Sequence, residues 1–491
     1  MKKIGFDNEK YLKIQKEEIK KRIEMFDQKL YLEFGGKLFD DFHASRILPG
    51  FEANSKIKIL QELKKDVEIV FCINANDIER KKTRADYGIT YDMELIRLIE
   101  NLQELDIYVS SVVITLYHDQ SSVESFRNLL HRKGIKTYLH SYTKGYPTEI
   151  ETIVSDEGYG KNEYIETTRK LVVVTAPGPN SGKLATCLSQ LYHEYKRGVN
   201  AGYAKYETFP VWNLPLKHPV NVAYEAATAD LKDVNMIDPF HLEAYEVSAV
   251  NYNRDIETFP ILKNILYKIV GHDIYQSPTD MGVNMVGNCI VDEEIVKEAC
   301  YEEIIRRYYN ALCEWKQGKV DEQVASKIKV LMNELGLDIA HRDVVLPALE
   351  KSNLEEKDVI SLKLPSGKIV TGKQTDLLSA ASSVVINAMK TMTNIPDDIF
   401  LLSPSVLDPI LSLKAKTIYK KPTCLNLQEV LIALSICSVT NPTISKALKK
   451  LDKLNGCEAH ASYMVTNGEL KILKNLKVNL TCESKFSKMN D

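Results

Sequence analysis

Three features are missing from this sequence, and each excludes a class of protein. No apolar run reaches the ~18 residues of a membrane-spanning helix, so we expect no membrane association. No Cys-x-x-Cys pair occurs, which argues against zinc ribbons and thioredoxin-type redox motifs. The first ten residues lack an apolar core, so we expect no secretory signal.

A charge excess of either sign is also missing. The chain has 64 basic and 67 acidic residues, a formal charge of −3. Such a balance provides no chain-wide field for polyanions, so we expect a small-molecule substrate and no nucleic-acid partner. Assembly into a homo-oligomer stays open at this stage.

The cysteines indicate a reducing compartment. There are nine, an odd number, and several lie inside apolar runs such as Val70–Ile73. We therefore predict a cytoplasmic protein with all of its thiols reduced. The nine are Cys72, Cys187, Cys289, Cys300, Cys313, Cys424, Cys437, Cys457 and Cys482.

What is present predicts a multidomain α/β protein. A chain of 491 residues is too long for one ordinary core. Short apolar runs alternate with helical segments at 93–105 and 122–133, after a helix predicted at 11–27. This alternation is typical of a mostly parallel sheet, which we assign to a domain over 1–290. The predicted strands are 29–34, 67–73, 109–116, 137–139 and 171–175.

The pattern changes twice after residue 290. Apolar residues at helical spacing predict a helical connector over 291–350. Alternation then returns and predicts a smaller C-terminal α/β domain over 351–491. There we expect a hairpin around Pro365-Ser366-Gly367, a helix at 377–392 and a strand at 399–402.

A turn that resembles a phosphate loop follows the predicted strand 171–175. Glycines let backbone N–H groups point inward, the following helix adds positive potential, and a lysine supplies a point charge. We therefore predict that ATP or another phosphorylated ligand binds at this turn. The candidate cofactor-binding residues are Gly178, Asn180, Ser181, Gly182 and Lys183.

The match to the phosphate-loop pattern is incomplete. The glycine spacing is one residue short, and Leu184 replaces the hydroxyl residue that would hold magnesium. Ser181 or Thr186 is the substitute hydroxyl that the sequence offers. The alternative interpretation is a plain Gly/Pro connection with an exposed lysine.

The segment 200–219 is rich in proline, aromatic and polar residues, and we expect no regular structure to run through it. Long irregular segments on α/β scaffolds commonly carry sites, although a ligand-free surface loop explains them equally well. Arg254 lies further along and suits a carboxylate or phosphate. The predicted catalytic residues are Lys205, Lys217, His218 and Arg254, with Glu207 and Asn213 as further contacts.

Three weaker candidates complete the set. The first is an acidic group that offers a magnesium ligand or general base: Glu225, Asp230, Asp233, Asp238 and His241. The second is 371–376, which precedes an Ala/Ser-rich helix and offers a second anion site or a capped helix start. The third is Cys457 with His460, a nucleophile and base or a metal pair, for which we favour a structural role.

Several of these motifs together resemble a bacterial family of uncharacterised proteins, the domain-of-unknown-function family number 1846. The resemblance rests on Ala176–Lys183, Lys217–Asn221 and Gly456–His460 and covers essentially the whole chain. It implies an N-terminal α/β domain, a helical portion and a C-terminal α/β subdomain. It implies no reaction.

Three functions remain open. The first is an enzyme of ligase or phosphotransferase type that binds ATP or another phosphorylated metabolite, with magnesium, and acts on a small polar substrate. The second is a non-catalytic nucleotide or metabolite sensor, which Leu184 favours. The third is a thiol- or metal-dependent enzyme at Cys457 and His460.

Overall fold

The computed structural model describes residues 4–26, 28–84, 88–417 and 424–487. The chain divides into two compact units, Met1–Cys300 and Tyr301–Asp491. The boundary falls inside a long helix, α13 (Glu293–Lys316), within the segment 291–350 that we predicted to be helical.

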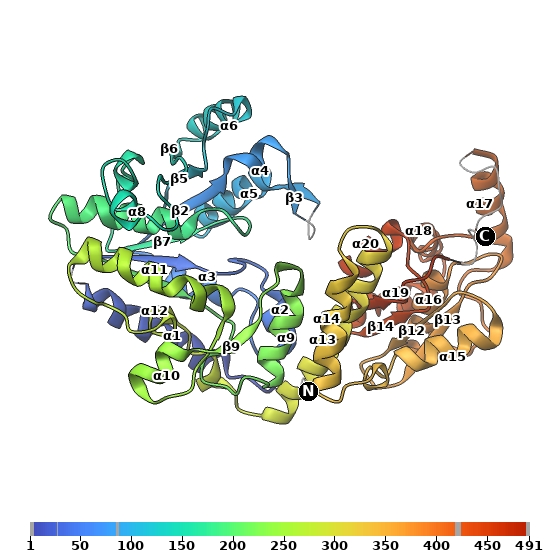
Figure 1. Cartoon of the computed structure of the whole chain (residues 1–491). Coiled ribbons are helices and arrows are strands. Elements are labelled where there is room, and N and C mark those ends of the chain that lie inside the picture. Colours follow the sequence, from blue (N-terminus) through green and yellow to red (C-terminus); the bar gives the residue numbers. More distant parts are fainter. Residues whose placement is uncertain (1–3, 27, 85–87, 418–423, 488–491) are drawn as a thin grey trace. The chain divides into compact units, whose positions relative to one another are not determined.

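The first unit is built on a seven-stranded sheet in which every pairing is parallel, with the order β11-β8-β1-β7-β2-β5-β6 (Figure 1). The parallel sheet that the sequence predicted is confirmed. The strands are β1 (Lys29–Phe34), β2 (Val67–Asn74), β5 (Val109–Thr115), β6 (Lys136–Leu139), β7 (Leu171–Thr175), β8 (Ala201–Tyr206) and β11 (Gly282–Val283).

Helices cover both faces of this sheet. On one face α1 contacts β1, β8 and α3, while on the other α8 contacts β1, β7, β8 and α11. The helix predicted at 11–27 is α1, and its last residue, Asp27, lies outside the described residues. The helices of this unit are α1 (Asn8–Met25), α2 (Phe42–Ile47), α3 (Ser55–Glu62), α4 (Ala75–Glu79), α5 (Tyr91–Glu104), α6 (Ser121–Arg132), α7 (Ile150–Ile153), α8 (Lys183–Lys196), α9 (Pro219–Ala227), α10 (Pro239–Tyr245), α11 (Asn253–Val270) and α12 (Pro278–Met281).

The order of strands creates a switch point. From β2 the chain moves through β5 to β6 on one side, whereas from β7 it moves back past β1 to β8 on the other. Neighbouring strands whose connections leave in opposite directions open a crevice at their carboxyl ends, where ligands of such sheets bind. In this unit the switch point lies between β7 and β2. Two small antiparallel pairs accompany the sheet, β3 (Thr83–Arg84) with β4 (Ile89–Thr90) and β9 (Asn235–Ile237) with β10 (Val250–Tyr252).

One expectation for the first unit is wrong. Regular structure does run through 200–219, because Ala201–Tyr206 is strand β8, paired with β1 on one side and β11 on the other. Its Gly202 has no side chain where one would meet the Phe26 ring at 2.1 Å. The glycine therefore marks close packing against the strand and not a turn.

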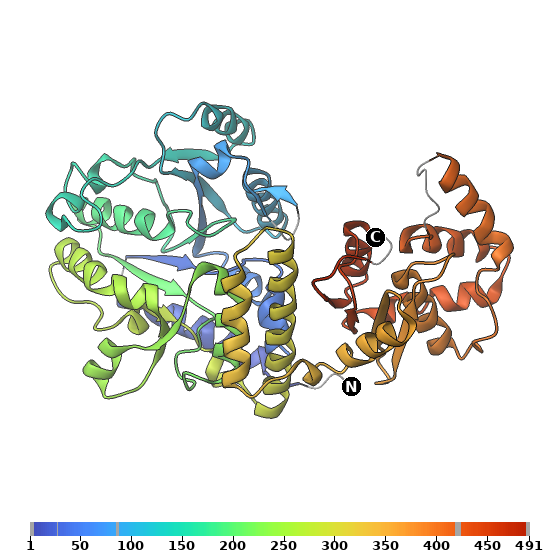
Figure 2. The same ribbon diagram turned by 45° about the vertical axis from the view of Figure 1, so that its right-hand side comes forward.

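The second unit, drawn in gold, orange and red in Figure 2, has a mixed sheet of four strands. Their order is β13-β12-β14-β15. β12 (Val359–Lys363) and β13 (Ile369–Lys373) form the predicted hairpin, while β14 (Glu458–Ala461) pairs antiparallel with β12 and parallel with β15 (Asn479–Cys482). The helices are α14 (Glu322–Glu334), α15 (Val345–Glu355), α16 (Ala380–Thr393), α17 (Pro404–Thr417), α18 (Leu427–Cys437), α19 (Pro442–Leu448) and α20 (Asn467–Asn475).

Two expectations for this unit are also wrong. Residues 399–402 form no strand; Pro396 and Pro404 flank the segment, and Phe400 is 73% exposed, so only its second half packs inward. Residues 371–373 complete β13, and α16 begins only at Ala380, capped by the hydroxyl of Ser379. The segment 371–376 is therefore not the start of a helix.

Candidate functional site

The glycine loop, which we define as Ala176–Gly182, joins the carboxyl end of β7 to α8 at the switch point. The ends of two neighbouring strands hold it in place. Asn74 at the end of β2 donates its side-chain amide to the carbonyl of Asn180 at 3.3 Å, and the Thr115 hydroxyl at the end of β5 donates to the carbonyl of Ser181 at 2.8 Å. The strand–loop–helix order predicted for this segment is confirmed.

Backbone conformation explains the glycines. Gly182 has φ +80° and lies so close to β5 that a Cβ would meet the Thr115 side chain at 2.9 Å. Asn180 also adopts positive φ, at +54°, and a Cβ on Gly178 would meet the Tyr91 ring at 2.7 Å. L side chains rarely adopt positive φ, which explains a glycine at 182 and an asparagine at 180, whereas the close approach to Tyr91 explains Gly178.

The start of α8 is open to an acceptor. Gly182 is the N-cap and provides no side-chain hydrogen bond, so the amides of the first turn lack the usual protein acceptor. The Ser181 side chain is 97% buried, and its hydroxyl has no partner among the described residues. The hydroxyl of Thr186 does not replace that of a phosphate loop, because it is buried against the Cys72 thiol.

Lys183 links the loop to the end of β1. Its ammonium lies 3.8 Å from the Glu33 carboxylate, and both side chains are largely buried. Glu33 also accepts a hydrogen bond from the Tyr203 hydroxyl at 2.9 Å. In the sheet register Glu33 is the partner of Lys205, so the two side chains lie on the same face as α8.

Lys205, which lies beside Glu33 in the sheet, is the centre of a buried group of polar side chains. It forms an ion pair with Glu207 at 2.8 Å and another with Asp255, and it lies over the ring of Tyr252. We call the set Glu33, Lys183, Lys205, Glu207, Tyr252 and Asp255 the lysine–carboxylate cluster.

Opposing effects set the protonation of this cluster. Burial alone would lower the pKa of Lys205, but the carboxylates of Asp255 and Glu207 raise it well above its ordinary value. Burial raises the pKa of Glu207, and Lys205 only partly offsets that effect. Strongly shifted groups gathered at a ligand-binding edge are typical of functional sites, although structural ion pairs produce shifts as well.

The other predicted catalytic residues have structural partners. His218 caps α9 through the Val220 amide and contacts Glu293 at 3.0 Å, and Lys217 beside it is exposed. Arg254 is paired with Asp233 at 2.7 Å. These contacts do not place His218 in the cluster. Arg254 borders it, because its guanidinium lies over the Tyr252 ring, 5.5 Å from the centroid. Asn213 donates to Asn288.

The predicted acidic group does not form a metal site. Asp238 caps α10, Asp233 pairs with Arg254, Glu225 accepts from the Asn235 amide, and Asp230 is exposed. His241 lies against Ser277. Across the described part of the chain, no three His, Cys, Asp or Glu side chains are arranged to hold a metal ion.

Cys457 and His460 are not a catalytic pair. They are three residues apart on an extended segment, so their side chains leave opposite faces of the sheet. Cys457 belongs to the apolar core of the unit, and burial raises its pKa to about 11. His460 contacts Thr481 and the Tyr309 ring on the other face. The structural role that we favoured for Cys457 agrees with this geometry.

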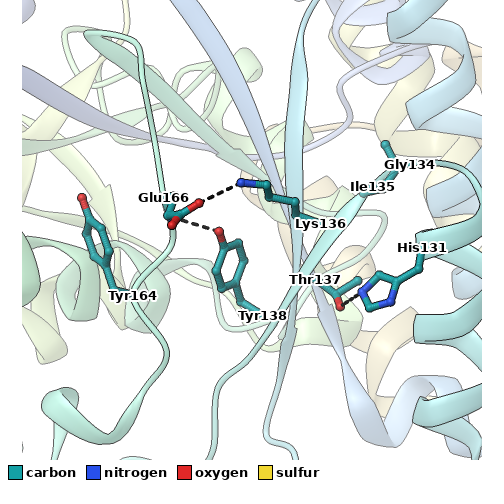
Figure 3. A pocket seen from close by; sticks show the side chains of 8 residues that line it. All are labelled: His131, Gly134, Ile135, Lys136, Thr137, Tyr138, Tyr164 and Glu166. Carbon is teal, nitrogen blue, oxygen red and sulfur yellow. Dashed lines mark hydrogen bonds and ion pairs between the residues drawn. The ribbon is translucent and has the colours of Figure 1, made fainter.

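A shallow hollow of about 550 Å³ lies at the edge of the sheet that β6 forms (Figure 3). It opens beside the start of β6, where Lys136 pairs with Glu166 at 2.8 Å and His131 bonds Thr137 at 2.8 Å. Two strands separate β6 from β7. The hollow therefore belongs to a different region from the glycine loop.

The fold and the site define a class: a two-unit α/β protein whose parallel sheet carries a glycine loop and a buried lysine–carboxylate cluster at its carboxyl edge. The chain belongs to the family with domain of unknown function DUF1846, whose N-terminal model matches residues 4–336 and whose C-terminal model matches 340–490. The resemblance seen in the sequence is thereby confirmed.

Relatives are similar along the whole chain. A UPF0371 protein from Clostridium tetani is 55% identical over 99% of this chain and 98% of its own length. One from Clostridium botulinum strain Kyoto is 56% identical with the same coverage, and one from Clostridioides difficile is 55% identical over 99% of both chains. In the described residues, no helix is long and apolar enough to cross a membrane.

Proposed function

We propose that the first unit binds a phosphorylated small molecule, with ATP as the leading candidate, at the glycine loop, and that the protein is an enzyme of ligase or phosphotransferase type. One observation carries the proposal: the loop delivers an uncapped helix start to the switch point of a parallel sheet. Both features favour a phosphate at the same position.

The neighbouring cluster supports chemistry on a second, polar substrate. Lys183 of the loop end contacts Glu33, Glu33 lies beside Lys205 in the sheet, and Lys205 forms an ion pair with Glu207. In this proposal the loop amides and Lys183 hold the phosphate, and Lys205 with Glu207 contacts the substrate. Magnesium enters with the phosphates, since Leu184 supplies no hydroxyl for it and such sites commonly use substrate oxygens.

The test is calorimetry of the full chain with ATP, pyrophosphate and inorganic phosphate. Lys183→Ala removes the charged contact and is expected to weaken binding by roughly 1.5–3 kcal/mol, the scale of a charge-assisted hydrogen bond. Lys196→Ala, at the far end of α8, is the matched control and is expected to bind normally. Wild-type affinity in Lys183→Ala would refute the phosphate-loop proposal.

A non-catalytic sensor is the second candidate, and Leu184 is the observation that favours it. The two candidates differ in their need for magnesium and in turnover. An enzyme is expected to bind ATP more tightly with magnesium and to release ADP or AMP once its substrate is supplied. Magnesium-independent binding without product would favour the sensor.

A further inference from the structure

The second unit contains a hollow of about 700 Å³ that the proposed function does not use. Its walls come from the turn between β12 and β13, the end of α16 with the segment that follows it, and the short helix η5 (Leu451–Leu454). Sites for small molecules usually measure about 300–1,000 Å³, so the hollow is large enough for a nucleotide-sized ligand.

Lysine side chains dominate the charge of the lining. Lys368 comes from the hairpin, and Lys450 and Lys453 come from η5 and the residue before it, whereas Asp397 is the single acidic residue of the lining. Within the described residues none of these three lysines forms an ion pair. Like charges that share a hollow repel one another, and a bound anion removes that cost.

A fourth lysine, Lys390, contacts the lining from inside the unit through Asp397. Lys390 is only 5% exposed, and its ammonium donates to the carbonyl of Asp397 at 2.8 Å, without a carboxylate partner in the described part of the chain. Buried lysines are normally paired with an acid. The carboxyl end of α16 favours this cation only modestly. The lining itself supplies one carboxylate, Asp397, against three lysines.

The remaining lining suits the body of a ligand. Leu364, Met392 and Ile395 supply apolar surface, and Ser366 and Thr391 supply hydroxyl groups. We propose that this hollow binds a small phosphorylated metabolite with an apolar body, of the size of a nucleotide, through Lys368, Lys450 and Lys453. The site is separate from the glycine loop, because all of its residues belong to the second unit.

The experiment is amine labelling of the full chain, resolved by peptide, with ATP as the probe. ATP is expected to reduce the labelling of Lys450 and Lys453 several-fold. The labelling of Lys446 in α19 and of Lys449 at its C-cap is expected to stay unchanged, because these two do not line the hollow. Unchanged labelling of Lys450 and Lys453 at millimolar ATP would refute the site. So would equal protection of all four lysines, which indicates unspecific charge binding.

Variants give a second readout by calorimetry. The double change Lys450→Ala and Lys453→Ala is expected to weaken the ATP site of the second unit by roughly tenfold or more, the size of one lost charge-assisted contact. The matched control, Lys446→Ala with Lys449→Ala, removes the same charge and is expected to bind normally. Equal loss in both proteins would overturn the proposal.

A comparison of probes tests the apolar part. Pyrophosphate carries the anion without an apolar body, so it is expected to protect the same lysines more weakly than ATP. Equal protection would contradict a role for the apolar lining. Lys183→Ala is expected to leave the protection of Lys450 and Lys453 unchanged, so failure of the loop proposal and failure of this one are distinguishable.

Discussion

Several buried charged residues in this protein are neutralised by their neighbours. Lys205 keeps its charge because Glu207 and Asp255 contact it, and fully buried Lys56 reaches Asp41 at 3.2 Å. His140 is buried without a charge. Its ring is 97% buried, and its Nε2–H donates to the carbonyl of Glu163 at 2.9 Å, which suits the neutral imidazole.

His140 predicts a specific pH dependence of stability. Burial lowers its pKa from 6.5 to about 4, so below pH 6.5 the unfolded chain binds a proton that the folded protein refuses. The free energy of unfolding therefore keeps its full value above pH 6.5. It falls by about 3 kcal/mol as the pH drops toward 4. We expect His140→Gln to be less sensitive to acid over this window in urea unfolding.

The control for this prediction is His131→Gln, because His131 is exposed on α6. It is expected to keep the acid sensitivity of the wild type. If His140→Gln lost stability between pH 6.5 and 4 as steeply as the wild type, the buried neutral imidazole would not be the cause.

At the scale of elements, periodicity predicted the buried strands well and the mixed segments poorly. β1 and β7 were predicted with their bounds, because Leu30, Leu32 and Leu171–Val174 form apolar runs between clear turn signals. β8 was missed because Gly202 and the polar residues around it imitate a loop. The glycine is required by packing against Phe26, a contact between distant segments that periodicity does not encode.

The candidate site was predicted in part for the same reason. Local sequence predicted the strand–loop–helix order around the glycine loop and drew attention to Lys205 and Glu207. It missed Glu33, which lies beside Lys205 because β1 and β8 are neighbours in the sheet. It noted the segment 251–255 but did not link Asp255 to Lys205, because that ion pair joins two distant segments. An acid near the end of an otherwise apolar strand, as at Glu33, was the available signal.

Strand β8 gives a prediction about packing. Gly202→Ala places a methyl group where the Phe26 ring lies, so we expect a loss of roughly 1–3 kcal/mol in the free energy of unfolding. Gly468→Ala in α20 is the control, since its Cβ would enter open space in a helix and is expected to be neutral or stabilising by up to about 1 kcal/mol. Equal stability of the two variants in urea titration would contradict this account.

At the scale of the whole molecule, none of the nine cysteines, which all lie in the described residues, forms a disulfide, and five of them are buried. Burial raises the pKa of the Cys72 thiol to about 12, so both access and thiolate formation are suppressed in the native protein. We expect thiol titration without reductant to count nine thiols in the denatured protein and fewer in the folded protein. A denatured count below nine would reveal disulfides and contradict the reducing compartment.

The position of β1 has a consequence for biosynthesis. This strand lies between β7 and β8, so its two hydrogen-bonded neighbours are the segments Leu171–Thr175 and Ala201–Tyr206. At ~5–20 residues per second, a ribosome needs on the order of ten to thirty seconds to make the roughly 170 residues from β1 to β8. Both edges of this apolar strand lack partners until β7 is made, and one edge stays unpaired until β8 follows, so chaperones that bind exposed strands have a long opportunity there.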